Sequence, residues 1–277
     1  TAKELIKVAS LSGVHAVKFQ AAIPELVCTN KSPLAKYQET NKSKTQLSLL
    51  SELHLPLNAY KELNQYAIDL GIEFMCSAFD CESLAYIDNL NVKHHKIASG
   101  EINHYPFLKQ IASYNKPTIL STGMATLKEI EESLNVLIKN GLDEKNIIIM
   151  HCTTDYPTNF EDVNLNALKT ISKTFKCPIG YSDHTIGKEI SIAALGMGCN
   201  YFEKHFTIDK NMRGPDHKAS LSIEELNSYV TTLKKVYSSL GNGIKIPTLN
   251  EKINKSIVRR SIDEKTIINK GDVFTEK

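Results

Sequence analysis

Tryptophan is absent from the 277-residue sequence, and aromatic residues make up only 7% of it. A carbohydrate-binding module presents exposed aromatic rings to its sugar, so this composition argues against that class of protein. The chain also lacks a strong charge of one sign, because 33 Lys and Arg stand against 31 Asp and Glu, a net charge of +2. No global field therefore draws it to nucleic acid or to a membrane surface.

Three further absences narrow the choice of fold. The longest apolar run is far too short to span a membrane. The six cysteines contain no CxxC pair and lie mostly in apolar runs, which predicts reduced core residues of a cytoplasmic protein. No Gly-x-Gly-x-x-Gly turn follows a strand, so an open dinucleotide-binding sheet is only the alternative architecture.

Helical and strand periods alternate along almost the whole chain. A helix at 2–11 comes first, and seven predicted strands then each precede a helix. The simplest arrangement is an α/β protein with a (β/α)8 TIM barrel whose first strand is not in this chain. We assign 1–245 to the barrel, 246–260 to a linker and 261–277 to the start of a second, small domain. The predicted strands are Val14–Gln20, Ile72–Ser77, His94–Ala98, Thr118–Ser121, Ile147–Cys152, Ile179–Ser182 and Tyr201–Phe206.

Two histidines lie at the centre of the predicted site. His184 and His205 end consecutive strands in the stretch PIGYSDHTIGKEISIAALGMGCNYFEKHF, residues 178–206. Parallel strands end at one edge of a sheet, so the two rings should share a mouth. Two neutral imidazoles without a certain third ligand predict an open divalent metal site that also holds water and substrate. A metal-dependent hydrolase that adds Asp183 is the alternative class of enzyme.

Cations and hydroxyls gather at the other strand ends. Lys18 and Lys96 lie inside apolar strands, where an unpaired ammonium group is costly. A serine at a strand-to-helix turn would by itself be read as a helix cap. Three of them beside two lysines instead predict a site for a phosphate or carboxylate ligand. These serines are Ser99, Ser121 and Ser182.

Carboxylates complete the predicted site. Glu101 and Glu203 are each candidates either for a general base or for a residue that orients a histidine or lysine. Asp216 lies in the polar loop after the last strand, opposite the histidines, where it is suited to bind a polyol.

Several motifs together resemble the bacterial sialic acid synthases, a family that includes N-acetylneuraminate and N,N'-diacetyllegionaminate synthases. The end of the chain, RRSIDEKTIINKGDVFTE, resembles the start of their C-terminal antifreeze-like (SAF) domain. The motifs are KIASGE (96–101), ILSTGM (119–124), HCTTDYPT (151–158), GYSDHT (180–185), EKHFT (203–207) and RGPDH (213–217).

The resemblance implies an enzyme that condenses phosphoenolpyruvate with N-acetylmannosamine or a close 2-acetamido aldose. The products would be an N-acetylneuraminate-type nonulosonic acid and phosphate, released by C–O cleavage. The diacetylated sugar of legionaminate synthases is the alternative acceptor. The relatives that make pseudaminic acid lack the glycine at position 100 and the Gly-Pro-Asp of 214–216, so the presence of these residues disfavours that group of enzymes. A divalent metal is also implied, typically Mn²⁺ with Mg²⁺ or Co²⁺ as options. So is a homodimer in which the SAF domain of one subunit covers the site of the other.

The resemblance also assigns roles to single residues. His184 and His205 match the metal ligands, and with Glu101 they form the implied catalytic set. Thr154 stands where relatives often have Asn or Ser. The sugar contacts would be Gln20, Tyr156 and Asp216. The phosphoenolpyruvate contacts would be Lys18, Ser77, Lys96, Ser99, Ser121 and Ser182.

Both ends of the sequence look cut, because it begins at Thr1 without methionine and ends at Lys277 without a closing element. A leader peptide upstream is left open. A glutamate of the family's first strand and an arginine of its SAF domain would then lie outside this chain. We therefore expect the 277 residues alone to bind metal and phosphoenolpyruvate poorly or not to turn over.

Overall fold

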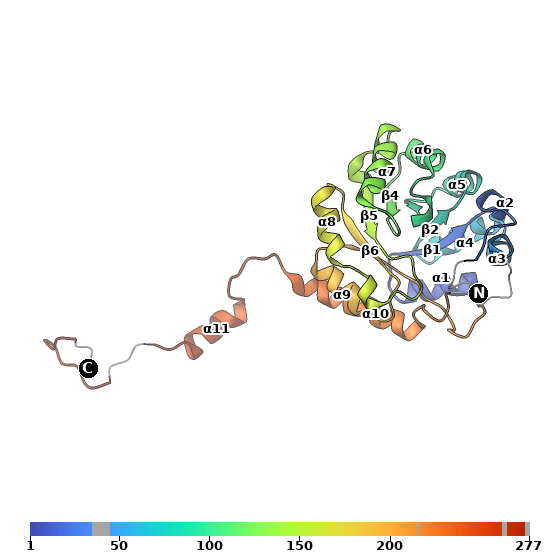
Figure 1. Cartoon of the computed structure of the whole chain (residues 1–277). Helices are drawn as coiled ribbons and strands as arrows, with labels where there is room; N and C mark the ends of the chain where they lie inside the picture. The colour runs from blue at the N-terminus through green and yellow to red at the C-terminus, as the bar shows by residue number, and fades with distance from the viewer. Residues whose placement is uncertain (35–44, 215, 262–264, 275–277) are drawn as a thin grey trace. The chain divides into compact units, whose positions relative to one another are not determined.

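Seven parallel strands form one sheet, in which each strand pairs with the next along the chain. The computed structural model describes residues 1–34, 45–214, 216–261 and 265–274, and in it the sheet curls with helices on its outer side (Figure 1). The parallel α/β arrangement is confirmed, and each strand begins and ends within two residues of its predicted bounds. The strands are β1 (Ala16–Ala21), β2 (Glu73–Ala78), β3 (His95–Ile97), β4 (Thr118–Ser121), β5 (Ile147–His151), β6 (Ile179–Asp183) and β7 (Tyr201–Lys204).

The helices bury one face each against the sheet. In α7 (Leu127–Lys139), Thr126 caps the first turn, and Ile130, Leu134 and Leu137 recur at helical spacing and are buried. None of the described helices combines the length and the apolar character needed to cross a bilayer. The other helices around the sheet are α1 (Ala2–Leu11), α4 (Leu57–Asp69), α5 (Cys81–Asp88), α6 (Tyr105–Tyr114), α8 (Asn166–Thr174), α9 (Glu189–Gly196) and α10 (Ile223–Leu240).

The apolar core lies between the sheet and this outer layer. One cluster joins the middle strands to α5–α8 and includes Phe107 and Leu120, both fully buried. A second joins β1 and β2 to α1 and α4 and includes Ile6 and Tyr60. Packing of this kind leaves few voids and holds the strands in register. The polar strand ends are therefore carried on a rigid scaffold.

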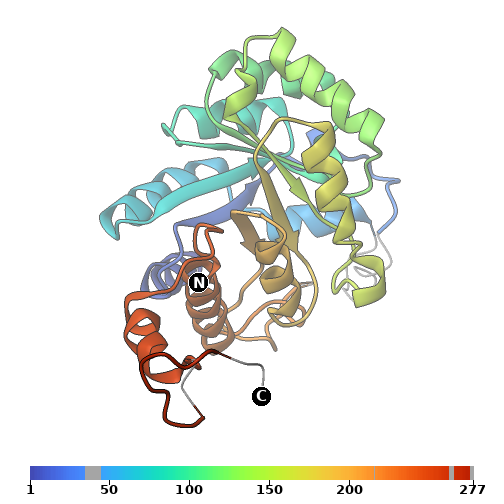
Figure 2. The same cartoon turned by 90° about the vertical axis from the view of Figure 1, so that its left-hand side faces the viewer.

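The curl brings the two edge strands close together. Lys18 Nζ on β1 lies 3.1 Å from Glu203 Oε2 on β7, at opposite ends of the strand order. Outside the sheet, α1 runs beside α10, where Lys234 Nζ donates a hydrogen bond of 2.7 Å to the carbonyl oxygen of Gly13 (Figure 2). The sheet is therefore a curled, nearly closed arc. The carboxyl ends of its strands surround an opening, which we call the mouth.

Short helices line the connections. The long segment after β1 contains α2 (Pro24–Val27) and α3 (Gln46–Leu53). Its residues 35–44 lie outside the described part of the chain. Three 3₁₀ turns lie later in the chain, at η2 (Ser99–Glu101), η3 (Glu144–Asn146) and η4 (Phe160–Asp162).

The chain divides into two compact units, Thr1–Ser239 and Leu240–Lys277. The second unit contains α11 (Leu249–Val258), which Thr248 and Glu251 begin with a capping box, so the predicted linker is mostly helical. Within the predicted SAF segment the described residues 265–274 form no strand, and a turn lies at 270–271.

Candidate active site

The predicted site residues lie at the carboxyl ends of the strands. Because all seven strands are parallel, these ends form one edge of the sheet. In this register Gln20 lies opposite Ser77, and Ser77 lies opposite Lys96. Side chains two apart on a strand share a face, which explains why Ser182 and His184 point to the same side.

Two lysines converge on one carboxylate at this edge. Lys18 Nζ lies 3.1 Å and Lys96 Nζ 3.9 Å from Glu203 Oε2. Lys96 also donates a hydrogen bond of 2.6 Å to Ser121 Oγ. Burial lowers the pKa of Lys96 to about 8, although Glu203 acts in the opposite direction. Burial alone would raise the pKa of Glu203, but Lys18 and Lys96 outweigh it and hold that pKa well below its usual range.

Two ammonium groups and two hydroxyls surround the Glu203 carboxylate, and we call this set the cradle. Its members are Lys18, Lys96, Ser121 and Ser182. Ser182 Oγ lies 3.0 Å from Glu203 Oε1. The sequence places Glu203 on the face of His205 but leaves its role open. What the sequence does not reveal is that this carboxylate lies between the two lysines, because that contact depends on the curl of the sheet.

The two histidines lie close enough to share a ligand. The ring centroids of His184 and His205 are 5.6 Å apart, with the planes at 75°. Burial lowers the pKa of both rings, that of His205 to about 3, so both are neutral at pH 7. His184 Nδ1 donates to the backbone oxygen of Thr153, 2.6 Å away, which leaves Nε2 as an acceptor.

Two acceptors, His184 Nε2 and Glu203 Oε1, compete for the single proton of the Ser182 hydroxyl. Ser182 Oγ lies 3.2 Å from His184 Nε2 as well as 3.0 Å from Glu203 Oε1. A serine hydroxyl has one proton, so it cannot donate to both acceptors. A divalent cation at Nε2 would resolve the conflict, and the donor set therefore fits a metal. Among the described residues, no group of three His, Cys, Asp or Glu side chains is placed to hold one.

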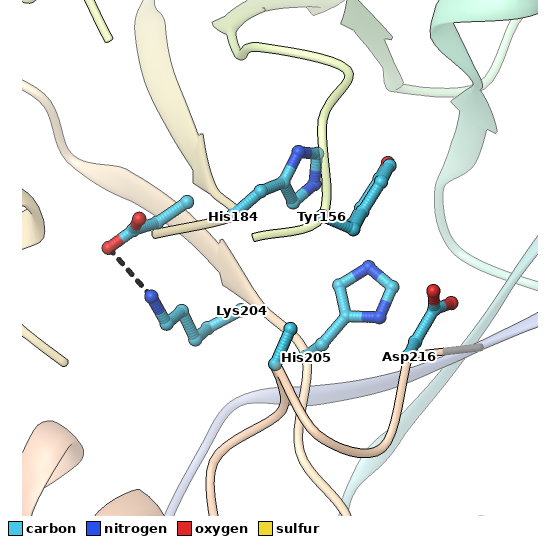
Figure 3. A pocket seen from close by; sticks show the side chains of 7 residues that line it. Tyr156, His184, Lys204, His205 and Asp216 are labelled. Atoms are coloured by element: carbon cyan, nitrogen blue, oxygen red, sulfur yellow. Dashed lines mark ion pairs between the residues drawn. The ribbon is translucent and has the colours of Figure 1, made fainter. Parts of the chain in front are cut away.

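Tyr156 and Asp216 surround the histidines. The Tyr156 ring lies 4.2 Å from that of His184 and 5.6 Å from that of His205, centroid to centroid. Figure 3 shows these three rings facing a common space, with Asp216 beyond His205. All four residues line the same pocket. Burial raises the pKa of Asp216, although His217 opposes it.

Asp183 lines the same pocket, but its carboxylate is bound to groups other than the histidines. It accepts hydrogen bonds from Thr185 and Ser191, and its Oδ2 lies 3.1 Å from Lys204 Nζ. Both carboxylate oxygens are therefore engaged, and the alternative of a hydrolase that uses His184, His205 and Asp183 lacks its third ligand.

Two buried hydroxyls at the mouth have no hydrogen-bond partner in the part of the chain that the structure describes. They are those of Ser77 and Thr154. A buried polar group without a partner is costly, so such groups commonly mark the place of a ligand. The backbone around Thr154 is tight, because a Cβ at Gly123 would lie 2.2 Å from Thr154 Oγ1. The N–H of Gly123 donates instead to Ser99 Oγ, at 3.0 Å.

The other predicted residues lie at the rim. Glu101 Oε2 is 2.7 Å from His104 Nδ1, and burial raises the pKa of Glu101 while His104 opposes it. The side chain of Gln20 is exposed. No hydrogen bond or ion pair within the described residues joins either Gln20 or Glu101 to the cradle.

Comparison with known proteins identifies relatives. The profile of the NeuB family matches residues 5–245. The chain is 47% identical to the N,N'-diacetyllegionaminic acid synthase of Campylobacter jejuni, covering 99% of this chain and 83% of that one. It is 40% identical to the enzyme of the same name from Legionella pneumophila, covering 98% and 77%. It is 34% identical to the human N-acetylneuraminate-9-phosphate synthase, covering 100% and 78%.

Solved structures agree with these relatives. The N-acetylneuraminic acid synthetase of Leptospira borgpetersenii superposes with a TM-score of 0.80 at 29% identity, covering 94% of this chain and 87% of that one. A phospho-2-dehydro-3-deoxyheptonate aldolase from Thermotoga maritima shares the fold, with a TM-score of 0.68 at 20% identity over 86% of this chain and 66% of that one. The predicted resemblance to sialic acid synthases is thus confirmed, and the chain belongs to the NeuB family.

Proposed function

We propose that this protein condenses phosphoenolpyruvate with a 2-acetamido aldose to form a nonulosonic acid and inorganic phosphate. One observation carries the proposal: Lys18 and Lys96 share a mouth with the pair His184 and His205. Phosphoenolpyruvate has a phosphate and a carboxylate, and two ammonium groups can neutralise both. The relatives named as synthases of legionaminic and neuraminic acids support the same class of reaction.

The cradle would bind phosphoenolpyruvate. Lys18 and Lys96 would neutralise its charges, and the hydroxyls of Ser99, Ser121 and Ser182 would donate to its oxygens. The unpartnered hydroxyl of Ser77 supports this placement, because a ligand oxygen would give it the missing partner. Thr154, also unpartnered, joins the set on the same ground.

His184 and His205 would hold the divalent metal, Mn²⁺ first, with Mg²⁺ or Co²⁺ as alternatives. Their neutral rings support this assignment, and so does the acceptor at His184 Nε2, which competes with Glu203 for the single proton of Ser182. When bound, the metal polarises the aldehyde of the open-chain sugar. Ser182 would then donate its proton to Glu203 without competition.

The reaction makes one carbon–carbon bond and breaks one carbon–oxygen bond. The methylene carbon of phosphoenolpyruvate attacks the aldehyde carbon, and the aldehyde oxygen takes a proton. Water adds to the cationic pyruvyl carbon, and the tetrahedral intermediate expels phosphate to leave the 2-keto acid. Lys18 and Lys96 offset the negative charge throughout. Glu101 is our candidate for proton transfer, because burial raises its pKa and allows it to hold a proton.

The acceptor sugar would lie against Gln20, Tyr156 and Asp216. Identities of 47% and 40% to two legionaminic acid synthases, against 34% to the human neuraminate enzyme, support a diacetylated acceptor. N-acetylmannosamine is the second acceptor to test. The free state of all six cysteines supports a cytoplasmic reaction.

The fold offers a place for one more strand. Within the described residues β1 and β7 each pair on one side only, and their side chains meet at Lys18 and Glu203. We propose that an eighth strand between them completes a (β/α)8 barrel. We also propose that 261–277 begin a SAF domain and that two subunits exchange it in a homodimer.

A coupled assay tests the function. Phosphate release from phosphoenolpyruvate by the full-length protein is measured with and without Mn²⁺, and with each acceptor sugar in turn. We expect release only when metal and acceptor are both present, and faster with the diacetylated sugar. Release without an acceptor would indicate hydrolysis of phosphoenolpyruvate and would contradict the proposal.

A further inference from the structure

The centre of the cradle is occupied by a carboxylate of the protein itself. Glu203 lies 3.1 Å from Lys18 Nζ, 3.9 Å from Lys96 Nζ and 3.0 Å from Ser182 Oγ. A bound phosphate or carboxylate would need the same ammonium groups and the same hydroxyl. The ligand and Glu203 therefore compete for one set of donors.

The contacts are partly open to the mouth. The side chains of Lys18 and Glu203 are 20% and 19% exposed, and that of Lys96 is 3% exposed. Lys18 and Glu203 are therefore accessible to a ligand from solvent, whereas Lys96 is buried. Among the described residues, the neighbouring Ser77 hydroxyl has no hydrogen-bond partner. Glu203 therefore pairs with the ammonium groups of the site but leaves this hydroxyl donor unpaired.

We propose that Glu203 is an internal counter-anion: it holds Lys18 and Lys96 in place while no substrate is bound, and it weakens the binding of any anion that enters. This inference rests on the proposed function, because it takes phosphoenolpyruvate as the anion that binds in spite of Glu203. Glu203 is in this sense a positioning residue that also sets specificity. Its carboxylate repels an incoming anion at short range, where like charges cost most.

The counter-anion discriminates between substrate and product. Inorganic phosphate offers a single anionic group for the two lysines. Phosphoenolpyruvate offers a phosphate and a carboxylate and can engage both lysines at once, so it tolerates the repulsion better. After the C–O bond to phosphate has broken, Glu203 binds Lys18, Lys96 and Ser182 again. This competition favours release of the phosphate ion.

Binding of inorganic phosphate to the full-length protein, measured by isothermal titration calorimetry, tests the role. In Glu203→Gln the shape and the hydrogen bond from Ser182 are kept but the charge is removed. We expect phosphate to bind at least about tenfold more tightly than to the wild type. We expect a smaller gain for phosphoenolpyruvate. Glu203→Asp, which keeps the charge, should stay near the wild type.

Glu101→Gln is the matched control. Glu101 is also a half-buried carboxylate, but its partner is His104 rather than a lysine. Its substitution should leave phosphate affinity unchanged. If Glu203→Gln is too unstable to titrate, thermal shift replaces calorimetry, because a ligand that binds the folded state more tightly raises the melting temperature more. Phosphate should then raise the melting temperature of Glu203→Gln more than that of the wild type.

Two results would overturn the inference. Unchanged or weaker phosphate binding in Glu203→Gln would mean that Glu203 only organises the lysines. If the wild type still binds phosphoenolpyruvate in that case, the proposed function stands and only the counter-anion role is wrong. If neither protein binds phosphoenolpyruvate or phosphate, both proposals are wrong.

Discussion

The amino ends and the carboxyl ends of the strands carry similar polar side chains, but these side chains are partnered differently. At the amino end, His94 Nδ1 lies 2.5 Å from Glu73 Oε1, and Asp88 Oδ1 lies 3.0 Å from His95 Nε2 and 2.6 Å from Lys116 Nζ. Each of these charges or rings has a defined partner. At the carboxyl end, one carboxylate serves two lysines, one hydroxyl proton faces two acceptors, and two buried hydroxyls have no partner.

The difference separates stability from function. A polar cluster whose hydrogen bonds are all made stabilises the fold, and breaking it costs folding energy. A cluster with unmet donors and acceptors is less stable than it could be, and a ligand can supply what is missing. Substitutions at the amino end should therefore lower stability, and substitutions at the mouth should lower activity.

The largest effect is expected at the mouth. Lys96→Met removes a buried ammonium group but nearly keeps the volume, so turnover should fall by about 10³-fold through loss of charge stabilisation. The melting temperature should change little. Phosphate release and thermal unfolding measure the two effects. A variant that keeps its activity would contradict the role of Lys96 in the cradle.

The amino end should show the opposite result. Asp88→Ala leaves His95 and Lys116 without their shared partner, so the free energy of unfolding should fall by about 2–3 kcal/mol. Turnover per folded molecule should stay unchanged. Urea denaturation measures the loss, and Asp88→Asn, which keeps an acceptor oxygen, should lose less. A drop in turnover without a drop in stability would reverse the comparison.

Two serines allow a matched test. Ser77 is buried and has no hydrogen-bond partner among the described residues. Ser133 is buried too, but its one hydroxyl proton has two backbone acceptors within reach, the carbonyl oxygens of Ile102 and Glu129. Ser133→Ala should lose about 1 kcal/mol of stability, and Ser77→Ala should lose none. Ser77→Ala should instead raise the KM for phosphoenolpyruvate. Equal stability losses in the two variants would show that Ser77 has a hidden structural partner.

The smallest effect concerns pH. Burial lowers the pKa of His95 in the folded protein, although Asp88 opposes it. The unfolded chain, with a pKa near 6.5, therefore binds a proton first as the pH falls. The stability from neutral His95 is present above about pH 6.5 and is lost below it, by about 1.4 kcal/mol per pH unit at most. In His95→Asn, unfolding free energies measured from pH 7 to 5 should fall less steeply, and an equal slope would contradict this account.

Sequence periodicity predicts the strands well, because buried parallel strands appear as short apolar runs and their polar ends mark one edge. His184, His205, Lys18 and Lys96 could be found in this way. The helix at α11 was not predicted, although its capping box, Thr248 with Glu251, is visible in the sequence.

Contacts that depend on the curl of the sheet could not be predicted. Nothing local to Glu203 shows that β1 comes round to meet it with Lys18. The contacts that engage the Asp183 carboxylate depend on Ser191 of α9 and on Lys204 of the next strand. The need for Gly123 follows from Thr154, some thirty residues further along the chain.

A crystal structure of the protein with phosphoenolpyruvate and Mn²⁺ tests the central claim most directly. We predict ligand oxygens within hydrogen-bond distance of Ser77 Oγ and of the ammonium groups of Lys18 and Lys96, with the metal at His184 and His205. A ligand bound elsewhere, with the Ser77 hydroxyl still unpartnered and both lysines still on Glu203, would contradict it.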